Sequence, residues 1–320
     1  RMMTKESLKI VYMGTPDFAV ESLRALVEGG YNIAAVVTMP DKPMGRHGSV
    51  LQPSPVKQYA LEQGLKIMQP ANLKDPQFIE DLRSLQADLQ IVVAFRMLPE
   101  VVWQMPKFGT FNAHASLLPK YRGAAPINWA VINGETETGI TTFFLKHEID
   151  TGDIIQQVRI PISETDNVET VHDKLMVLSG KLVTETVDNI IAGTVKSIPQ
   201  DQFTNVELTP APKIFRDTCR IDWNQPTKKV YDFIRGLSPY PAAWTTLDGK
   251  AVKIFEAERE AISTPGEKPG AIQTDGKTYM KVITSDGALN ILTLQLEGKR
   301  RMPISDLLRG FQLAGNSFFV

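Results

Sequence analysis

The chain has 320 residues, of which 42% are hydrophobic and 22% are charged, and its formal net charge is −1. These values are ordinary for a soluble globular protein, and the length predicts two domains rather than one. Because no apolar run approaches the roughly 18 residues that span a bilayer and no signal-peptide core is present, we expect a cytoplasmic protein without a membrane partner. The single cysteine, Cys219, excludes an internal disulfide framework.

The first half of the chain alternates strand and helix signals. An apolar run at residues 8–13 predicts a strand that ends at Gly14, and Thr15 is suited to cap a helix that begins at Pro16. Further strands are expected at 33–37 and 89–94, helices at 55–63 and 75–86, and a loop at 38–55. This order predicts an α/β fold with a Rossmann-like, mostly parallel sheet and helices on both faces. The three-glycine fingerprint of nicotinamide-binding proteins is missing after Gly14.

Beyond residue 140, strand and helix signals continue up to a long helix and then give way to a proline-rich stretch. Strands are expected at 141–145 and 153–160 around a tight turn, a helix at 168–192, and a shorter helix near 227–236. Four prolines between residues 199 and 226 give this stretch the composition of a linker. Short β segments with regular turns follow and predict a small barrel or sandwich. We therefore expect a first domain at 1–200, a linker at 201–222 and a β domain at 223–320.

Chemically capable residues are densest at residues 112–123, which read Asn-Ala-His-Ala-Ser-Leu-Leu-Pro-Lys-Tyr-Arg-Gly. Asn112 and His114 are two residues apart at the end of an expected strand, so both side chains lie on one face. A carboxamide donor beside an imidazole can stabilise an oxyanion and move a proton. Spacing alone is equally compatible with a histidine that satisfies backbone groups in a turn. Ser116 lacks the Gly-x-Ser-x-Gly context of a serine hydrolase.

This stretch resembles the signature of the 10-formyltetrahydrofolate-dependent formyltransferases. Members of that family share an Asn, a His and a later Asp as catalytic residues, which match Asn112, His114 and Asp150 here. Asp150 follows His114 by 36 residues, as in the family. The resemblance to the members that formylate methionyl-tRNA extends over nearly the whole chain, through segments 12–19, 38–46, 220–223 and 298–302. It implies that the C-terminal domain is an OB-like β-barrel.

The resemblance also implies a reaction and roles for individual residues. An uncharged amine would attack the formyl carbon directly, through a tetrahedral intermediate. Asn112 and a protonated His114 would donate hydrogen bonds to the oxyanion, and Asp150 would pair with His114. The co-substrate 10-formyltetrahydrofolate is expected to contact Phe95, Arg96, Met97, Leu98, Ser116, Leu117, Leu118 and Pro119. The methionyl-tRNA enzymes of the family more often carry Tyr-Gly in place of Phe95 and Arg96.

Charge is distributed unevenly along the chain. Residues 1–210 hold 19 Lys and Arg against 24 Asp and Glu, a net of −5, whereas residues 211–320 hold 16 against 12, a net of +4. A basic C-terminal third suits a polyanionic partner. Together with the resemblance, it predicts initiator methionyl-tRNA as the acceptor, bound through Lys42, Arg46, Lys213, Lys299, Arg300 and Arg301.

Two alternatives stay open at this stage. A sugar-nucleotide amine N-formyltransferase would use the same folate donor and the same trio of residues, but should lack the long basic loop at 38–55. A non-catalytic tRNA-binding protein would have no need of an intact trio. The sequence has no cluster of metal-ligating residues, so we expect no essential metal, and we expect no obligate protein partner.

Overall fold

The computed structural model describes residues 2–261 and 267–320, with Arg46 described for its backbone only. The chain divides into two compact units whose segments interleave in sequence. Unit 1 comprises Arg1–Gly123, Thr138–Ile160 and His172–Pro210, and unit 2 comprises Ala124–Glu137, Pro161–Val171 and Ala211–Val320. Two segments that lie between parts of unit 1 in the sequence, Ala124–Glu137 and Pro161–Val171, therefore belong to unit 2. The domain boundaries expected at residues 200 and 222 stay a prediction.

Unit 1 is built on a seven-stranded sheet with the order β5-β2-β1-β6-β7-β8-β9. The strands are β1 (Lys9–Gly14), β2 (Asn32–Val37), β5 (Ile67–Met68), β6 (Leu89–Val93), β7 (Thr110–His114), β8 (Glu137–Phe144) and β9 (Ile154–Pro161). The pairs β1–β2, β1–β6, β2–β5 and β6–β7 are parallel, and β7–β8 is antiparallel. The predicted mostly parallel sheet is confirmed.

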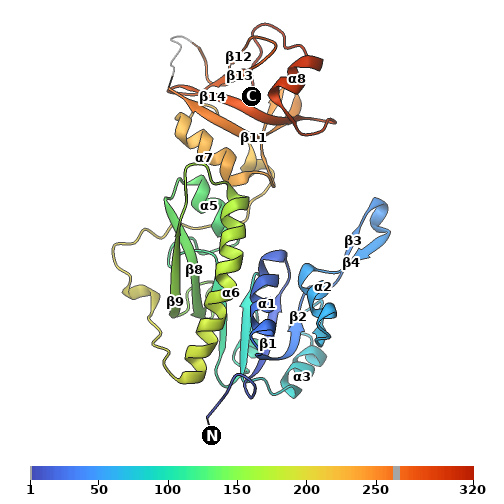
Figure 1. Ribbon diagram of the computed structural model, residues 1–320, viewed down its shortest axis with the longest axis vertical. Coiled ribbons are helices and arrows are strands. Elements are labelled where there is room, and N and C mark those ends of the chain that lie inside the picture. The colour runs from blue at the N-terminus through green and yellow to red at the C-terminus, as the bar shows by residue number, and fades with distance from the viewer. Residues whose placement is uncertain (1, 262–266) are drawn as a thin grey trace. The chain divides into compact units, whose positions relative to one another are not determined.

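Helices cover both faces of this sheet (Figure 1). They are α1 (Asp17–Glu28), α2 (Pro55–Glu62), α3 (Pro76–Ser84), α4 (Glu100–Trp103) and α6 (Val168–Ala192), and unit 1 also contains the short η2 (Gln200–Gln202). On one face α1 packs against α6, where the hydroxyls of Ser22 and Ser179 lie 3.1 Å apart. On the other face Phe78 of α3 and Val102 of α4 belong to the core cluster that contains Val11 of β1. The buried strands thus supply the apolar layer that both helical layers need.

The turn between β1 and α1 differs from the predicted cap. The helix begins at Asp17, and Pro16 occupies the cap position without a side-chain hydrogen bond. Thr15 instead accepts a hydrogen bond from the Met39 backbone N–H at 3.3 Å, so its hydroxyl joins two loops. A Cβ at Gly14 would lie 2.7 Å from the Ala19 Cβ, so this turn has room only for glycine.

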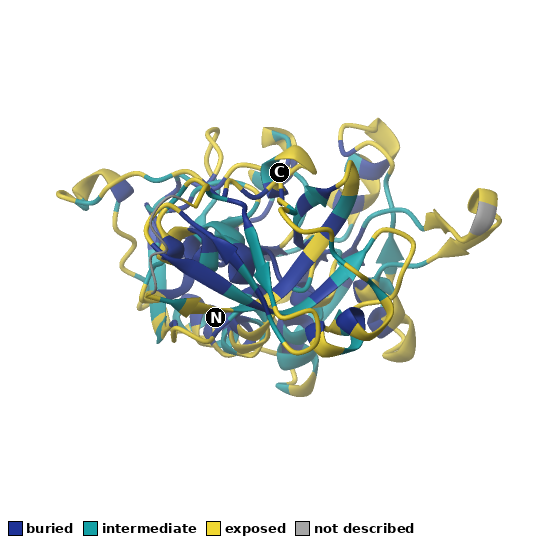
Figure 2. Cartoon of the chain, turned by 90° about the horizontal axis from the view of Figure 1, so that it is seen from above, coloured by how far each residue is buried: buried dark blue, intermediate teal, exposed yellow. Residues whose placement is uncertain are grey.

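Residues 38–55 are not the loop that the sequence predicted. They form an antiparallel hairpin of β3 (Lys42–Met44) and β4 (Val50–Gln52), joined by the short helix η1 (Arg46–Gly48). All six residues of the two strands are exposed (Figure 2), so the ribbon is held by backbone pairing and leaves no pattern of buried side chains in the sequence.

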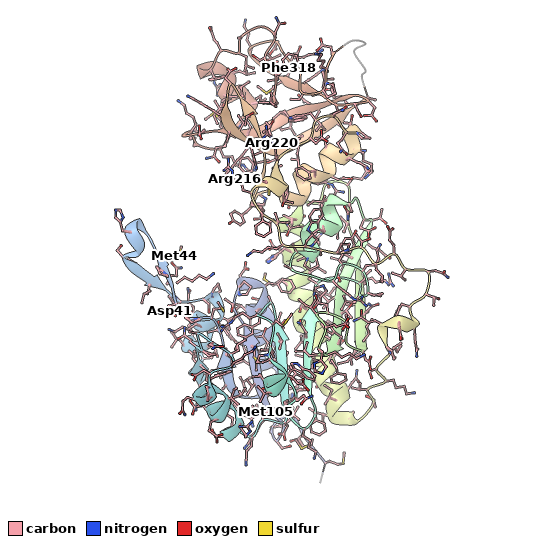
Figure 3. The ribbon with its side chains drawn as sticks, turned by 180° about the vertical axis from the view of Figure 1, so that it is seen from behind. Asp41, Met44, Met105, Arg216, Arg220 and Phe318 are labelled. Atoms are coloured by element: carbon pink, nitrogen blue, oxygen red, sulfur yellow. The ribbon has the colours of Figure 1, made fainter. Side chains whose placement is uncertain are left out.

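The base of this hairpin is anchored by one carboxylate. Asp41 accepts hydrogen bonds from Lys57 Nζ at 3.0 and 3.1 Å and from Gln69 Nε2 at 2.7 Å. Figure 3 shows Asp41 at the foot of the hairpin and Met44 further along it. The hydrogen bonds from Gln69 and then Lys57 hold the pKa of Asp41 below its ordinary value.

Unit 2 contains a six-stranded antiparallel sheet in which β10-β11-β14-β13-β12 form the main path and β15 pairs with β14. Its elements are α5 (Pro126–Ile132), η3 (Asp217–Cys219), α7 (Thr227–Leu237), β10 (Ala243–Leu247), β11 (Lys250–Glu260), β12 (Ile272–Thr274), β13 (Met280–Ile283), β14 (Ala288–Leu296), β15 (Met302–Pro303) and α8 (Ile304–Gly310). Turns at residues 247–249, 274–276 and 285–287 lie between consecutive strands, which confirms the small C-terminal β domain.

The packing of helix α5 explains why a segment of unit 2 lies between segments of unit 1 in the sequence. It packs against α7, and a Cβ at Gly236 of α7 would lie only 2.5 Å from Ile132 Cγ1. The Asn128 carboxamide also donates a hydrogen bond to the Gly236 carbonyl at 3.0 Å. Among the described residues, no helix is both long and apolar enough to cross a membrane.

Candidate active site

The sequence places Asn112 and His114 on β7, near the middle of the unit 1 sheet. Asn112 pairs with Val92 of β6 on one side and with Phe143 of β8 on the other, and His114 pairs with Thr141. Since neighbouring side chains of a strand alternate between faces, Asn112 and His114 share one face of the sheet. Neighbouring strands on both sides therefore fix the position of this pair.

The imidazole of His114 is buried and is held on both sides by oxygen atoms. Its Nε2 lies 2.8 Å from the Tyr121 carbonyl oxygen. Its Nδ1 lies 3.8 Å from Asp150 Oδ2, which is longer than a hydrogen bond but within ion-pair distance. Because Nε2 must donate its proton to the carbonyl, Nδ1 is the ring nitrogen that remains for chemistry.

Asp150 reaches His114 from a strained turn. Its φ of 56° lies in the left-handed region, and its side chain is 8% exposed. The Gly123 backbone N–H donates to Asp150 Oδ2 at 2.9 Å. Gly152 is required in the same turn, because a Cβ there would lie 1.5 Å from the Phe144 carbonyl oxygen. The carboxylate is therefore directed at the imidazole by backbone geometry.

Asn112, the third residue of the predicted trio, differs from His114 and Asp150 in its hydrogen bonding. It is half-buried, and in the described part of the chain no group forms a hydrogen bond with its carboxamide. A carboxamide without an internal partner is available to donate to a substrate oxygen. The structure thus brings His114 and Asp150 into contact, and it leaves the Asn112 carboxamide, on the same strand face as His114, without a hydrogen-bond partner among the described residues.

The first segment expected to contact folate follows the end of β6. Ala94 has a φ of 49° and is exposed, so the chain turns sharply as it leaves the strand. The Arg96 guanidinium donates to the Pro70 and Ala71 carbonyls at 2.8 and 3.0 Å and lies over the Phe95 ring, and burial lowers the pKa of Arg96. These contacts are internal, so Arg96 holds the neighbouring loop in place in this structure.

The rest of this segment and the second segment differ in exposure. Met97 is 66% exposed, whereas Leu98 is packed in the core. Ser116, Leu118 and Pro119 are buried, and only Leu117 of the second segment is half-buried.

The buried turn that contains Ser116 is held by its own hydrogen bonds. The Ser116 hydroxyl donates to the Lys120 carbonyl at 2.7 Å. Thr141 Oγ1 donates to the Ser116 carbonyl at 2.7 Å and accepts from the Leu118 N–H at 3.1 Å. Any folate contact in this turn is therefore through the backbone or through Leu117.

The basic residues expected to bind tRNA lie in both units. Lys42 of unit 1 and Lys213, Lys299 and Arg300 of unit 2 are exposed. Arg301 is also exposed, but it pairs with Glu256 at 3.1 Å and lies over the Phe255 ring. Arg46 begins η1, and its side chain lies outside the described part of the structure.

Sequence reasoning missed the residues that support the Asp150 turn. Gln200 is buried, and its amide donates to the Asp150 and Gly152 carbonyls at 2.8 and 2.7 Å. Arg122, which the signature contains without an assigned role, donates to Gln200 Oε1 at 2.8 Å. No local pattern marks Gln200, which lies 50 residues from Asp150 in a proline-rich stretch. In residues 2–261 and 267–320, no group of three or more His, Cys, Asp or Glu side chains could hold a metal ion.

Both parts of the sequence match known protein families. Residues 8–187 match the formyl transferase family, and residues 213–312 match the C-terminal domain of formyl transferases. The chain is 66% identical to the methionyl-tRNA formyltransferase of Parabacteroides distasonis, over 97% of this chain and 98% of that protein. It is 68% identical to the methionyl-tRNA formyltransferase of Bacteroides thetaiotaomicron, over 98% of each chain.

Two solved structures share the fold at low sequence identity. An N-formyltransferase from Helicobacter canadensis is 19% identical, with a TM-score of 0.66 over 92% of this chain and all of that one. HypX from Aquifex aeolicus is 21% identical, with a TM-score of 0.63 over 95% of this chain and 47% of that one. These two similarities concern the fold alone, whereas the family matches and the close relatives cover nearly the whole sequence. The chain therefore belongs to the formyl transferase family and, within it, to the methionyl-tRNA formyltransferases.

Proposed function

We propose that this enzyme transfers the formyl group of 10-formyltetrahydrofolate to the α-amino group of methionine on initiator methionyl-tRNA. The observation that carries the proposal is the buried contact between His114 Nδ1 and Asp150 Oδ2, 3.8 Å apart, on the strand face that also bears Asn112. The chain that contains this pair is 66% identical to one of the two methionyl-tRNA formyltransferases named above and 68% identical to the other.

The three side chains supply what direct formyl transfer needs. As the amine nitrogen bonds to the formyl carbon, the formyl oxygen becomes an oxyanion, and Asn112 donates a hydrogen bond to it. His114 Nδ1, when protonated, is the second donor, and the charge of Asp150 stabilises that imidazolium. The bond from the formyl carbon to the folate nitrogen then breaks. One proton leaves the attacking amine and one is delivered to the departing folate nitrogen, so a relay at His114 and Asp150 balances the reaction.

Backbone groups account for folate recognition better than side chains do. The sharp turn at Ala94 exposes the chain immediately after β6, at the carboxyl end of a parallel strand where ligands of such sheets bind. Phe95, Met97 and Leu117 are the side chains in the expected folate segments that are half-buried or exposed and form no hydrogen bonds among the described residues, and Phe95 also packs against the core. The departure of Phe95 and Arg96 from the usual Tyr-Gly pair is compatible with folate use, because Arg96 has an internal role.

The choice of acceptor is supported by sequence identity and surface charge. The Helicobacter canadensis N-formyltransferase covers 92% of this chain, so a C-terminal β domain by itself does not separate tRNA enzymes from other N-formyltransferases. The identity of 66–68% to methionyl-tRNA formyltransferases favours tRNA. The exposed Lys42, Lys299 and Arg300 are suited to contact phosphates.

The test is a radiolabelled formyl-transfer assay with three acceptors: charged initiator tRNA, free methionine and a nucleotide-linked amino sugar. We expect transfer to methionyl-tRNA at a kcat/KM at least about 1000-fold above the others, because the small acceptors lack the phosphate contacts. A higher kcat/KM for the amino sugar would replace the proposed acceptor and leave the formyl-transfer site standing.

A further inference from the structure

Asp150 occupies a backbone conformation that it does not adopt readily by itself. A left-handed φ of 56° in a non-glycine residue costs free energy, on the order of 1 kcal/mol, and persists only where surrounding contacts over-determine it. Inside the turn, the Thr151 hydroxyl donates to the Glu148 carbonyl at 2.9 Å. Among the described residues, hydrogen bonds from outside the turn come from two distant segments, at Gly123 and at Gln200, and His114 adds an ion-pair contact.

The side-chain amide of Gln200 binds two backbone carbonyls of the Asp150 turn. Its Nε2 donates to the Asp150 carbonyl at 2.8 Å and to the Gly152 carbonyl at 2.7 Å, so one amide group fixes the two carbonyls that flank Thr151. Gln200 is 4% exposed, and water therefore has little access to replace these bonds. Its own position is fixed because Ile198, two residues before it, exchanges two backbone hydrogen bonds of 2.8 Å with Ile154 of β9.

Arg122 determines which way the Gln200 amide points. Its Nε and Nη2 atoms lie 3.2 and 2.8 Å from Gln200 Oε1. A guanidinium can only donate, so the amide oxygen must face Arg122 and the amide nitrogen must face the two carbonyls. The residues on either side of Arg122 contact the catalytic pair directly, through the Tyr121 carbonyl on His114 and the Gly123 N–H on Asp150.

We propose that Gln200, oriented by Arg122, is a positioning residue of the formyl-transfer reaction that holds the Asp150 carboxylate at its distance from His114. The inference rests on the proposed function, because it takes Asp150 as part of the catalytic pair. It assigns a role to a residue that touches neither His114 nor the Asp150 side chain and acts through the backbone of the turn. A displacement of about 1 Å at a reacting group lowers the rate by about 100-fold.

The decisive variants are Gln200→Glu and Gln200→Met. Gln200→Glu keeps the shape and the contact with Arg122 but replaces the N–H donors with an oxygen that faces two carbonyls. Gln200→Met removes both donors without adding charge and serves if the charged variant does not fold. We expect kcat to fall by about 10- to 100-fold in each, with the KM for folate and for tRNA changed less than about threefold. Gln202→Glu, in the same η2 helix and exposed, is the matched control and should retain the wild-type kcat.

A double-mutant cycle separates positioning from a general loss of structure. Each Gln200 substitution is combined with Asp150→Asn, and single-turnover formyl transfer is measured beside the urea midpoint of unfolding. A residue that acts through the Asp150 carboxylate should have less than about a twofold effect on the rate in the Asp150→Asn background. An equal loss of rate in both backgrounds, or a wild-type kcat in both Gln200 variants, would overturn the inference.

The same experiment distinguishes this inference from the proposed function. If Asp150→Asn alone turns over at the wild-type rate, the catalytic pair itself is wrong. If Asp150→Asn is inactive while Gln200→Met is fully active, the pair stands and only the positioning role fails. Two substitutions of Arg122 give a last check. Arg122→Lys, which keeps one donor near Gln200 Oε1, should retain more activity than Arg122→Met, which keeps none.

Discussion

The Asp150 turn and the β3–β4 hairpin use opposite means to present functional residues. In the turn, Asp150 is buried, and the side chain and backbone carbonyl both have internal hydrogen-bond partners. In the hairpin, Lys42 and its neighbours are exposed and the ribbon is anchored at one end, through Asp41. The turn is thus fixed from several sides and the hairpin from one.

This difference corresponds to two physical tasks. Chemistry at a carbonyl requires donors and charges that are already in place, since reorganisation during the reaction would raise the barrier. A surface that meets a large polyanion gains most of its affinity from long-range charge and tolerates adjustment on contact. Substitutions in the turn should therefore lower kcat, whereas substitutions in the hairpin and the C-terminal basic residues should act on KM and on salt dependence.

The largest effect is expected for His114→Ala, which removes the imidazole between Tyr121 and Asp150. Loss of one oxyanion donor typically lowers kcat by about 100- to 1000-fold, and the paired Asp150 charge would also be left without its partner. The measurement is single-turnover formyl transfer at saturating substrates, with folate binding followed by fluorescence. Folate affinity should stay within about threefold of wild type. A kcat near the wild-type value would remove His114 from the mechanism.

Gly152→Ala should break the turn by steric overlap. The new methyl carbon would lie 1.5 Å from the Phe144 carbonyl oxygen, so the backbone must move. We expect the free energy of unfolding to fall by about 2–4 kcal/mol, with kcat reduced as well, measured by urea unfolding and steady-state kinetics. Gly310→Ala, where no atom of the described residues lies within 4 Å of the new atom, is the matched control. Equal stability of both variants would show that the turn is more adaptable than its contacts indicate.

Asp41→Asn should weaken the anchor of the hairpin without touching the reaction. Asp41 and Lys57 are half-buried and still accessible to solvent, so their ion pair contributes modestly, and we expect the KM for tRNA to rise by about two- to fivefold with kcat unchanged. The control is Glu80→Gln, which removes the exposed pair with Arg83 on α3 and should leave KM unchanged. A fall in kcat with a constant KM would place Asp41 in the chemistry instead.

The anchor should also depend on pH with a defined sign. The pKa of Asp41 in the folded chain is lowered from 3.8, so its stabilising contribution is complete above that value. It is lost as the pH falls from 3.8 through the lower folded pKa. Hydrogen exchange at residues 42–52, corrected for intrinsic rates, should lose its wild-type protection in that window, and Asp41→Asn should show low protection on both sides of it. Protection that rises on acidification would contradict the assignment.

The smallest effect is expected at the C-terminal basic residues. Lys299→Ala removes an exposed charge, so tRNA affinity should fall by about two- to fivefold and the slope of log affinity against log salt should decrease by about 1. Arg301→Ala should also lower stability, by about 0.5–1 kcal/mol, because it loses contact with Phe255 and Glu256. Lys181→Ala, an exposed lysine on α6, is the control. An unchanged salt slope in Lys299→Ala would exclude a phosphate contact there.

Much of unit 1 could be predicted because its signals are local. The apolar run of β1 and the periodicity of α6 determined those elements almost to the residue, since burial on a sheet or under a helix leaves a pattern in the sequence. The hairpin could not be predicted, because an exposed two-stranded ribbon has no buried face. Thr15 was misassigned as a cap because its hydroxyl has a tertiary partner, the Met39 N–H, that no local rule indicates.

The residues of the candidate site likewise include some that could be predicted from the sequence and some that could not. Asn112 and His114 could be placed on one strand face from their spacing, and Asp150 came from a family signature. Their support could not be predicted: Gln200 reaches the Asp150 turn only after α6 and β9 are in place, and its neighbours in sequence read as a linker. The sequence also could not predict that α5 belongs to unit 2, because this depends on the packing of Ile132 against Gly236.

The most direct test of the account is single-turnover formyl transfer to charged initiator tRNA by Asp150→Asn, measured beside its folate affinity and its urea midpoint. The asparagine keeps the size of the side chain but removes the charge that faces His114 Nδ1 at 3.8 Å. We predict a rate at least about 100-fold below wild type, with folate affinity unchanged and the protein folded. A wild-type rate in a folded Asp150→Asn variant would contradict the claim that this buried pair performs the reaction.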